Sequence, residues 1–144
     1  MSKNPVVHFE MGYKDKDRMV KFYQDAFGWT TQDMGPNMGG YVVAQTADTD
    51  DKGMIQTPGS INGGFYQKTD DPTSQAPSVV VSVDDIQVAM KAVESAGGKI
   101  LGAKLPDGTQ TMEPVDIPGV GKWLSVEDTE GNRFSILQAL PRSN

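Results

Sequence analysis

The chain has 144 residues and contains no cysteine. This absence excludes disulfide bonds, thiolate metal sites and a cysteine nucleophile. Histidine is almost absent as well, because His8 is the only one in the sequence. No serine lies in a nucleophile elbow, so a serine–histidine triad has no local support. Chemistry that needs an imidazole must therefore use His8.

The sequence also lacks a long apolar run and an excess of basic residues. Residues 1–5 have no apolar signal-peptide core, so we expect a soluble cytoplasmic protein with no membrane partner. The formal net charge is −6 and the pI is about 4.6. Nucleic-acid binding requires a basic surface that neutralises phosphates, so we predict no nucleic-acid partner.

The start of the chain predicts a strand followed by a helix. In Val6–Met11 apolar and polar residues alternate, which places His8 and Glu10 on one face and Val7, Phe9 and Met11 on the other. The next segment carries apolar residues at helical spacing. These are Met19, Phe22, Tyr23, Ala26 and Phe27. Asp15 or Asp17 can cap this helix at its N-terminus, and Gly28 can end it.

The rest of the first half predicts three further strands. Residues 30–46 are typical of a hairpin, and Ile61–Gln67 of another strand. The paired Gly63 and Gly64 indicate a bulge or a ligand close to the backbone. Residues 48–53 form an acidic loop that is no calcium site, because Lys52 and Gly59 occupy positions where a calcium loop needs carboxylates.

The second half repeats this pattern at an offset of 70 residues. Strand residues 77–83 are followed by an acidic turn, an amphipathic helix from Ile86 and glycines at 97–98. We expect a strand that starts at Ile100, a long loop over 105–121, and two strands at 123–127 and 133–137. Each half thus predicts a β-α-β-β-β order, with a first module at 1–68, a linker at 69–77 and a second module at 78–140. The predicted core is Val7, Phe9, Met11, Phe22, Phe27, Val79, Val81, Val93, Phe134 and Ile136.

Three stretches give the chain a family resemblance. They are VVHFEM with DRMVKFYQDAFGW, then SVVVSVDDIQVAMKAVESAGGKI, and finally GKWLSVEDTEGNRFSILQ. In both modules, over roughly residues 5–140, the chain resembles the vicinal oxygen chelate superfamily of glyoxalases, bleomycin-resistance proteins and extradiol dioxygenases. The resemblance implies an α+β fold in which two βαβββ modules form a curled mixed sheet with the helices outside. It also implies a homodimer, and a metal held by one residue from each of four strands.

Transferred position by position, the resemblance supplies only one metal ligand. His8 matches the histidine of the first strand, whereas residues 63–65 offer no acid, and Ser78 and Ser135 stand at the two remaining positions. One histidine with serines is inadequate for a divalent metal, so we expect no conventional metal site and no cofactor. Glu10 shares the face of His8, and we expect it to favour the protonated imidazole.

Three functions remain open from the sequence. The first is a bleomycin-resistance-like protein that binds a small molecule in a cleft between the modules. The second is a metal-dependent lyase, isomerase or dioxygenase of the same superfamily, and the third is a non-catalytic interaction domain. His8 and Glu10 are candidate ligand contacts in the first function and the candidate catalytic residues of an enzyme, and His8 is the candidate metal ligand. The candidate ligand-binding residues are Phe65, Ser78, Trp123 and Ser135.

Overall fold

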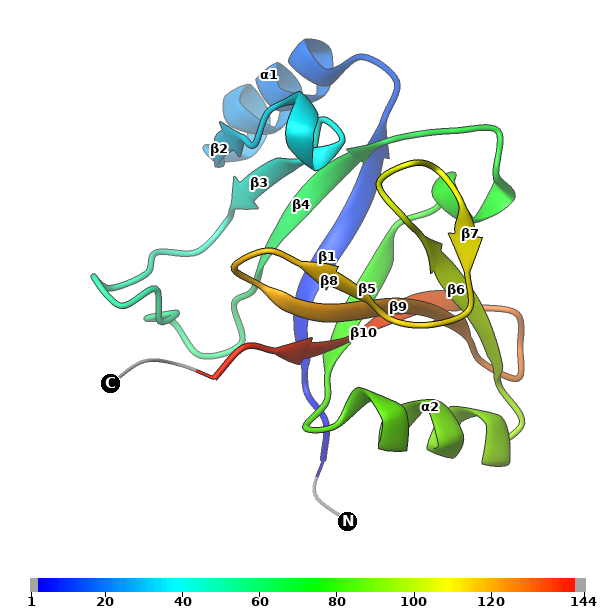
Figure 1. The fold of residues 1–144 in the computed structure, drawn as a ribbon. Coiled ribbons are helices and arrows are strands. Elements are labelled where there is room, and N and C mark those ends of the chain that lie inside the picture. The colour runs from blue at the N-terminus through cyan, green and yellow to red at the C-terminus, as the bar shows by residue number, and fades with distance from the viewer. Residues whose placement is uncertain (1–2, 142–144) are drawn as a thin grey trace. The chain divides into compact units, whose positions relative to one another are not determined.

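The computed structural model describes residues 3–141 of the chain (Figure 1). They form two compact units. The N-terminal unit comprises residues 7–78. The C-terminal unit comprises residues 79–141 together with residues 3–6. No helix in this described part of the chain is long and apolar enough to cross a membrane.

The N-terminal unit is a four-stranded mixed sheet with one helix. Its elements are β1 (Val6–Tyr13), α1 (Lys16–Phe27), β2 (Thr30–Asp33), β3 (Val42–Gln45) and β4 (Asn62–Gln67), with short 3-10 turns at Pro36–Met38 and Pro72–Ser74. The strand order is β2-β3-β4-β1, in which β1 and β4 are parallel and the other pairs antiparallel. The predicted β-α-β-β-β order is therefore confirmed for this unit.

The predicted caps of the first helix are also confirmed. The Asp15 carboxylate accepts the Arg18 backbone N–H at 3.0 Å, which satisfies one of the free donors of the first turn. Gly28 ends the helix with a φ of 73°, in the left-handed region, and its N–H donates to the Gln24 carbonyl at 3.0 Å. A residue with a side chain would be strained there.

The core of the N-terminal unit lies between α1 and the sheet. Phe65 is fully buried at its centre. Phe9 and Met11 of β1 face it together with Met19 and Tyr23 of α1. The residues of the opposite parity, His8 and Glu10, therefore lie on the sheet face away from this core.

The predicted core is wrong at four positions. Phe22 and Phe27 are 57% and 63% exposed, and Val7 and Val79 are each 40% exposed. The buried stripe of α1 is narrow, and Phe22 and Phe27 lie beside it, with their rings packed edge-on at 6.3 Å between centroids. The apolar spacing of the helix was read correctly, but only part of the stripe meets the sheet.

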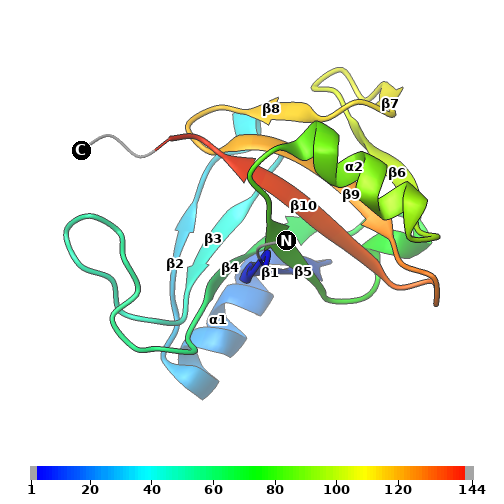
Figure 2. The ribbon, with the colours of Figure 1, turned by 90° about the horizontal axis from the view of Figure 1, so that it is seen from below.

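A side chain closes the long loop between β3 and β4. The Asn62 Oδ1 atom accepts the backbone N–H groups of Thr46 at 2.8 Å and Ala47 at 2.9 Å. The Thr46 hydroxyl donates to the Ile61 carbonyl at the same place. The loop, whose course Figure 2 shows, therefore leaves and re-enters the sheet at one hydrogen-bonded base. Its acidic tip around residues 48–53 is mostly exposed.

The C-terminal unit repeats the same order with two extra short strands. Its elements are β5 (Ser78–Ser82), α2 (Ile86–Ser95), β6 (Lys99–Lys104), β7 (Gln110–Thr111), β8 (Val115–Ile117), β9 (Gly121–Glu127) and β10 (Arg133–Ala139). Its sheet runs β5-β10-β9-β6-β7, and β8 pairs with β9. Helix α2 packs on β6, β9 and β10 (Figures 1 and 2). The core of this unit includes Leu124, Val126 and Ile136.

One prediction for this unit is confirmed and another is wrong in part. The predicted α+β class built from two βαβββ modules is confirmed, because β5, α2, β6, β9 and β10 reproduce the first module. The predicted loop over 105–121 is wrong in part, because it contains β7 and β8. Both strands are only two or three residues long and pair antiparallel with β6 and β9.

Candidate functional site

A tyrosine lies over the sheet face that carries His8. Tyr41, directly before β3, places its hydroxyl oxygen 2.9 Å from His8 Nε2. The ring fits there because residue 64 is glycine: a Cβ atom at this position would overlap the Tyr41 ring and hydroxyl. In the β1–β4 register Gly64 is the neighbour of Glu10, so the tyrosine lies between His8 and Glu10.

Glu10 completes this group. Only 9% of the residue is exposed, an unusual burial for a carboxylate. Burial first, and then the charge and hydrogen bond of Glu10, raise the pKa of the Tyr41 hydroxyl well above its usual value. Since a carboxylate can only accept a hydrogen bond, the Tyr41 hydroxyl keeps its proton and donates a hydrogen bond to Glu10. The Tyr41 oxygen then accepts from His8, which assigns the Nε2–H tautomer to the imidazole.

Burial also governs the charge of His8. Desolvation lowers the pKa of its imidazole below the ordinary value of 6.5. The prediction that Glu10 favours the protonated ring is therefore wrong. The carboxylate pairs with Tyr41, and the imidazole is left neutral at neutral pH. His8, Tyr41 and Glu10 form what we call the His8 network.

The two glycines of β4 have a different role from the one expected. The ladder runs without interruption from Phe9–Gly63 to Glu10–Gly64, so no bulge is present there. A Cβ atom at Gly63 would overlap the Phe9 ring on the core face, as one at Gly64 would overlap Tyr41 on the other face. Both glycines therefore make room for aromatic rings of the chain itself.

The donors around His8 do not fit a conventional divalent metal site. His8 Nε2 is engaged with Tyr41, position 64 has no side chain, and the Asn62 Oδ1 atom accepts two loop N–H groups. Within residues 3–141, no group of three or more His, Cys, Asp or Glu side chains is placed to hold a metal ion. A structural or catalytic metal needs at least three protein donors.

The other candidate site residues lie outside the His8 network. Phe65 is fully buried in the core of the N-terminal unit, on the opposite face of its sheet. Ser78, at the start of β5, is 8% exposed. Phe65 thus offers no exposed surface to a ligand, and a binding role for Ser78 stays a prediction.

Trp123 and Ser135 share one sheet face of the C-terminal unit. Ser135 is opposite Ser125 in the β9–β10 register and is fully buried, and its Oγ has no hydrogen-bond partner among residues 3–141. The Arg133 guanidinium lies 5.9 Å from the Trp123 ring centroid, and its Nε donates to Ser125 Oγ at 2.9 Å. The structure therefore places Trp123 and Ser135 on one sheet face, where Arg133 contacts Trp123 and Ser125.

Tyr41 is the main site residue that sequence reasoning missed. It lies 33 positions from His8, beyond the reach of local periodicity. The signal available was the glycine pair itself, because a strand glycine marks a close approach of another group. That group is a tyrosine of the same unit.

Comparison with known proteins places this geometry in a family. A family model described as "Glyoxalase/Bleomycin resistance protein/Dioxygenase superfamily" matches residues 6–136. A glyoxylase-like domain-containing protein of Didymella fabae is 29% identical over 129 residues, which cover 88% of each chain. The anthracycline biosynthesis protein DnrV of Streptomyces peucetius is 28% identical over 143 residues, which cover 89% of this chain but 44% of DnrV.

A solved structure shows the same fold over almost the whole length. A variant of Streptomyces coelicolor methylmalonyl-CoA epimerase, in complex with 2-nitronate-propionyl-CoA, has a TM-score of 0.65 with this structure. The match covers 99% of both chains at 14% sequence identity. At this identity the likeness concerns the fold alone.

Proposed function

The chain belongs to the Glyoxalase/Bleomycin resistance protein/Dioxygenase superfamily, and we propose that it binds a small organic molecule at the His8 network without a conventional metal site. The observation that supports this most is the partly buried Tyr41 hydroxyl, held between a neutral imidazole and the buried carboxylate of Glu10. Buried polar groups of this kind are costly unless they are paired, and they cluster at functional sites.

The chemistry of the network defines what such a ligand must offer. A neutral imidazole and a phenol provide directional hydrogen bonds but no fixed positive charge. A polar group on the ligand would contact His8 or Tyr41, and the rest would contact the surrounding sheet face. The fold relative bound to a CoA thioester analogue and the relative named for anthracycline biosynthesis suggest two ligand classes to test, acyl thioesters and polycyclic aromatic ketones.

The binding experiment compares matched variants by isothermal titration calorimetry with these two classes. We expect His8→Gln and Tyr41→Phe each to weaken binding at least tenfold, because a hydrogen bond to a buried polar group is removed. Tyr23→Phe is the matched control, since its hydroxyl lies 3.7 Å from the Met11 sulfur in the core. Equal affinity of Tyr41→Phe and the unchanged protein would refute the site.

Native mass spectrometry of the same samples tests the remaining parts of the proposal. We expect no bound nickel, zinc, manganese or iron after these metals are added, and we expect the mass of a homodimer. One metal per subunit that is lost in His8→Ala would overturn the metal-free assignment and favour the metal-dependent enzymes of the superfamily.

A second candidate function is proton transfer by His8. The lowered pKa keeps the imidazole in its basic form at neutral pH, as a general base requires. For a ligand with an acidic C–H bond, the base would remove the proton and return it from the same ring. Exchange of that hydrogen into D2O, followed by NMR and lost in His8→Gln at a ligand concentration that saturates this weaker-binding variant, would support this function. Bound ligand without exchange would leave the chain a binding protein.

A further inference from the structure

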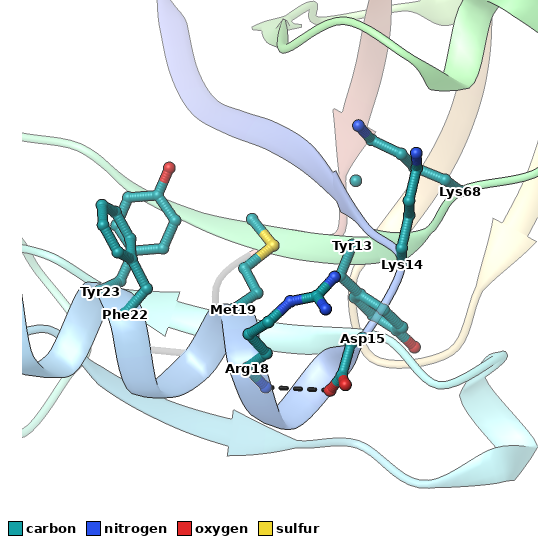
Figure 3. Close-up of a pocket in the computed structure, with 9 residues that line it drawn as sticks. Tyr13, Lys14, Asp15, Arg18, Met19, Phe22, Tyr23 and Lys68 are labelled. Atoms are coloured by element: carbon teal, nitrogen blue, oxygen red, sulfur yellow. Dashed lines mark hydrogen bonds between the residues drawn. The ribbon is translucent and has the colours of Figure 1, made fainter.

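A pocket of about 530 Å³ lies in the N-terminal unit at the junction of β1, α1 and the end of β4 (Figure 3). Its lining shares no residue with the His8 network. Basic and apolar side chains line different parts of this pocket. Basic side chains come from Lys14, Arg18 and Lys68, and an apolar wall comes from Met19, Phe22 and Tyr23 of α1.

In the part of the chain that the structure describes, none of the three cations forms an ion pair. Among residues 3–141 the ion pairs are Lys16–Asp33, Lys21–Asp25 and Lys122–Asp116. Lys14, Arg18 and Lys68 come from three separate segments, yet they line one pocket in a chain whose net charge is −6. Like charges brought together repel each other, so a bound anion would relieve an unfavourable arrangement.

The one carboxylate in the pocket is already engaged. Asp15 caps α1, and its Oδ1 atom accepts the backbone N–H of Arg18, as the dashed line in Figure 3 shows. This bond occupies the Arg18 backbone and leaves its guanidinium available. The three cations therefore outnumber the single acid, and the pocket is basic.

The apolar wall explains why the ligand would not be a simple inorganic anion. Phe22 is 57% exposed, and its ring meets the Tyr23 ring edge-on at 5.0 Å between centroids. In the view of Figure 3 these two rings lie at one end, the Lys14 and Lys68 side chains lie at the other, and Met19 is between them. A molecule that covers the aromatic end buries apolar surface while its charged end reaches the lysines.

We propose that this pocket binds an amphiphilic organic anion, a molecule with an aromatic or aliphatic body and one carboxylate, sulfonate or phosphate group. The anionic group lies among Lys14, Arg18 and Lys68, and the apolar body lies against Phe22 and Met19. This site is separate from the His8 network and does not depend on the function proposed for it.

The test uses the fluorescent probe 8-anilinonaphthalene-1-sulfonate with the full-length protein. We expect each of Lys14→Gln, Lys68→Gln and Arg18→Gln to weaken binding about two- to fivefold, because exposed ion pairs contribute modestly. The triple variant should lose about tenfold or more. Raised salt should weaken binding to the unchanged protein by screening the same contacts. Sodium sulfate at the probe concentration should not displace the probe.

Two controls make the result specific. Lys91→Gln, on the exposed surface of α2 in the C-terminal unit, removes one positive charge without touching the pocket and should leave the affinity unchanged. Amide chemical shifts in a two-dimensional NMR titration should move at residues 12–23 and 68. Unchanged affinity in the triple variant, an equal loss in Lys91→Gln, or shifts confined to other segments would each overturn the proposal. His8→Gln should bind the probe normally, so this site and the His8 network can fail independently.

Discussion

The fit of Tyr41 over Gly64 allows a quantitative test. In Gly64→Ala the new methyl group overlaps the Tyr41 ring, so the ring must leave its place between His8 and Glu10. Overpacking of this kind costs about 1–3 kcal/mol. The hydrogen bond from Tyr41 to the buried Glu10 is lost as well, at about 1–3 kcal/mol. Since both costs are not fully additive, we expect the free energy of unfolding to fall by about 2–4 kcal/mol.

Urea and thermal unfolding would measure this loss, which corresponds to a fall in Tm of roughly 6–15 °C at this chain length. A double-mutant cycle with Tyr41→Ala isolates the cause. Once the ring is absent, Gly64→Ala should change the stability by less than about 0.5 kcal/mol. Gly63→Ala is the matched control: its methyl group overlaps Phe9 on the core face, so Tyr41→Ala should not rescue it. An equal cost of Gly64→Ala in both backgrounds would refute the argument.

Three further results are expected. The NMR titration of His8 should have its midpoint below pH 6.5, and a midpoint above 6.5 would contradict the burial argument. Because the folded state disfavours the protonated imidazole, the free energy of unfolding should be constant above pH 6.5 and fall as the pH drops through the lowered pKa. In an absorbance titration Tyr41, one of four tyrosines, should stay protonated well above pH 10, and four tyrosines with ordinary titrations would contradict its raised pKa. The stability that this raised pKa provides is present below pH 10 and is lost at higher pH. Phe65→Ala should cost about 3–5 kcal/mol and Phe22→Ala less than about 1 kcal/mol, as denaturant unfolding would show, and equal costs would contradict their burial.

The sequence predicted the features that depend on residues close together in the chain, such as strand faces and helix ends. Alternation in β1 separated His8 and Glu10 from Phe9 and Met11, and the polar cap and Gly28 located the helix ends. The repeat between the two halves then predicted the order of elements in both units.

The features that the sequence did not predict depend on contacts between residues that are distant in the chain. Apolar spacing alone does not say how much of a helix stripe a sheet will cover, so Phe22 was assigned to the core although it is mostly exposed. The strands β7 and β8 are too short to show alternation and exist through pairing with β6 and β9. The expected charge of His8 was wrong because burial lowers the pKa of the imidazole, while Glu10 accepts a hydrogen bond from Tyr41.

The base formed by Asn62 and Thr46 has a consequence for engineering. Because the loop between β3 and β4 begins and ends at one hydrogen-bonded closure, changes at its tip need not shift the strands that flank it. The entropic cost of closing a loop rises only slowly with the length of the loop. An epitope tag or a small reporter peptide inserted near Asp51 should thus leave the fold intact. In a variant that lacks the Asn62 amide, the same insertion should disturb β4, because the hydrogen bonds that close the loop are lost.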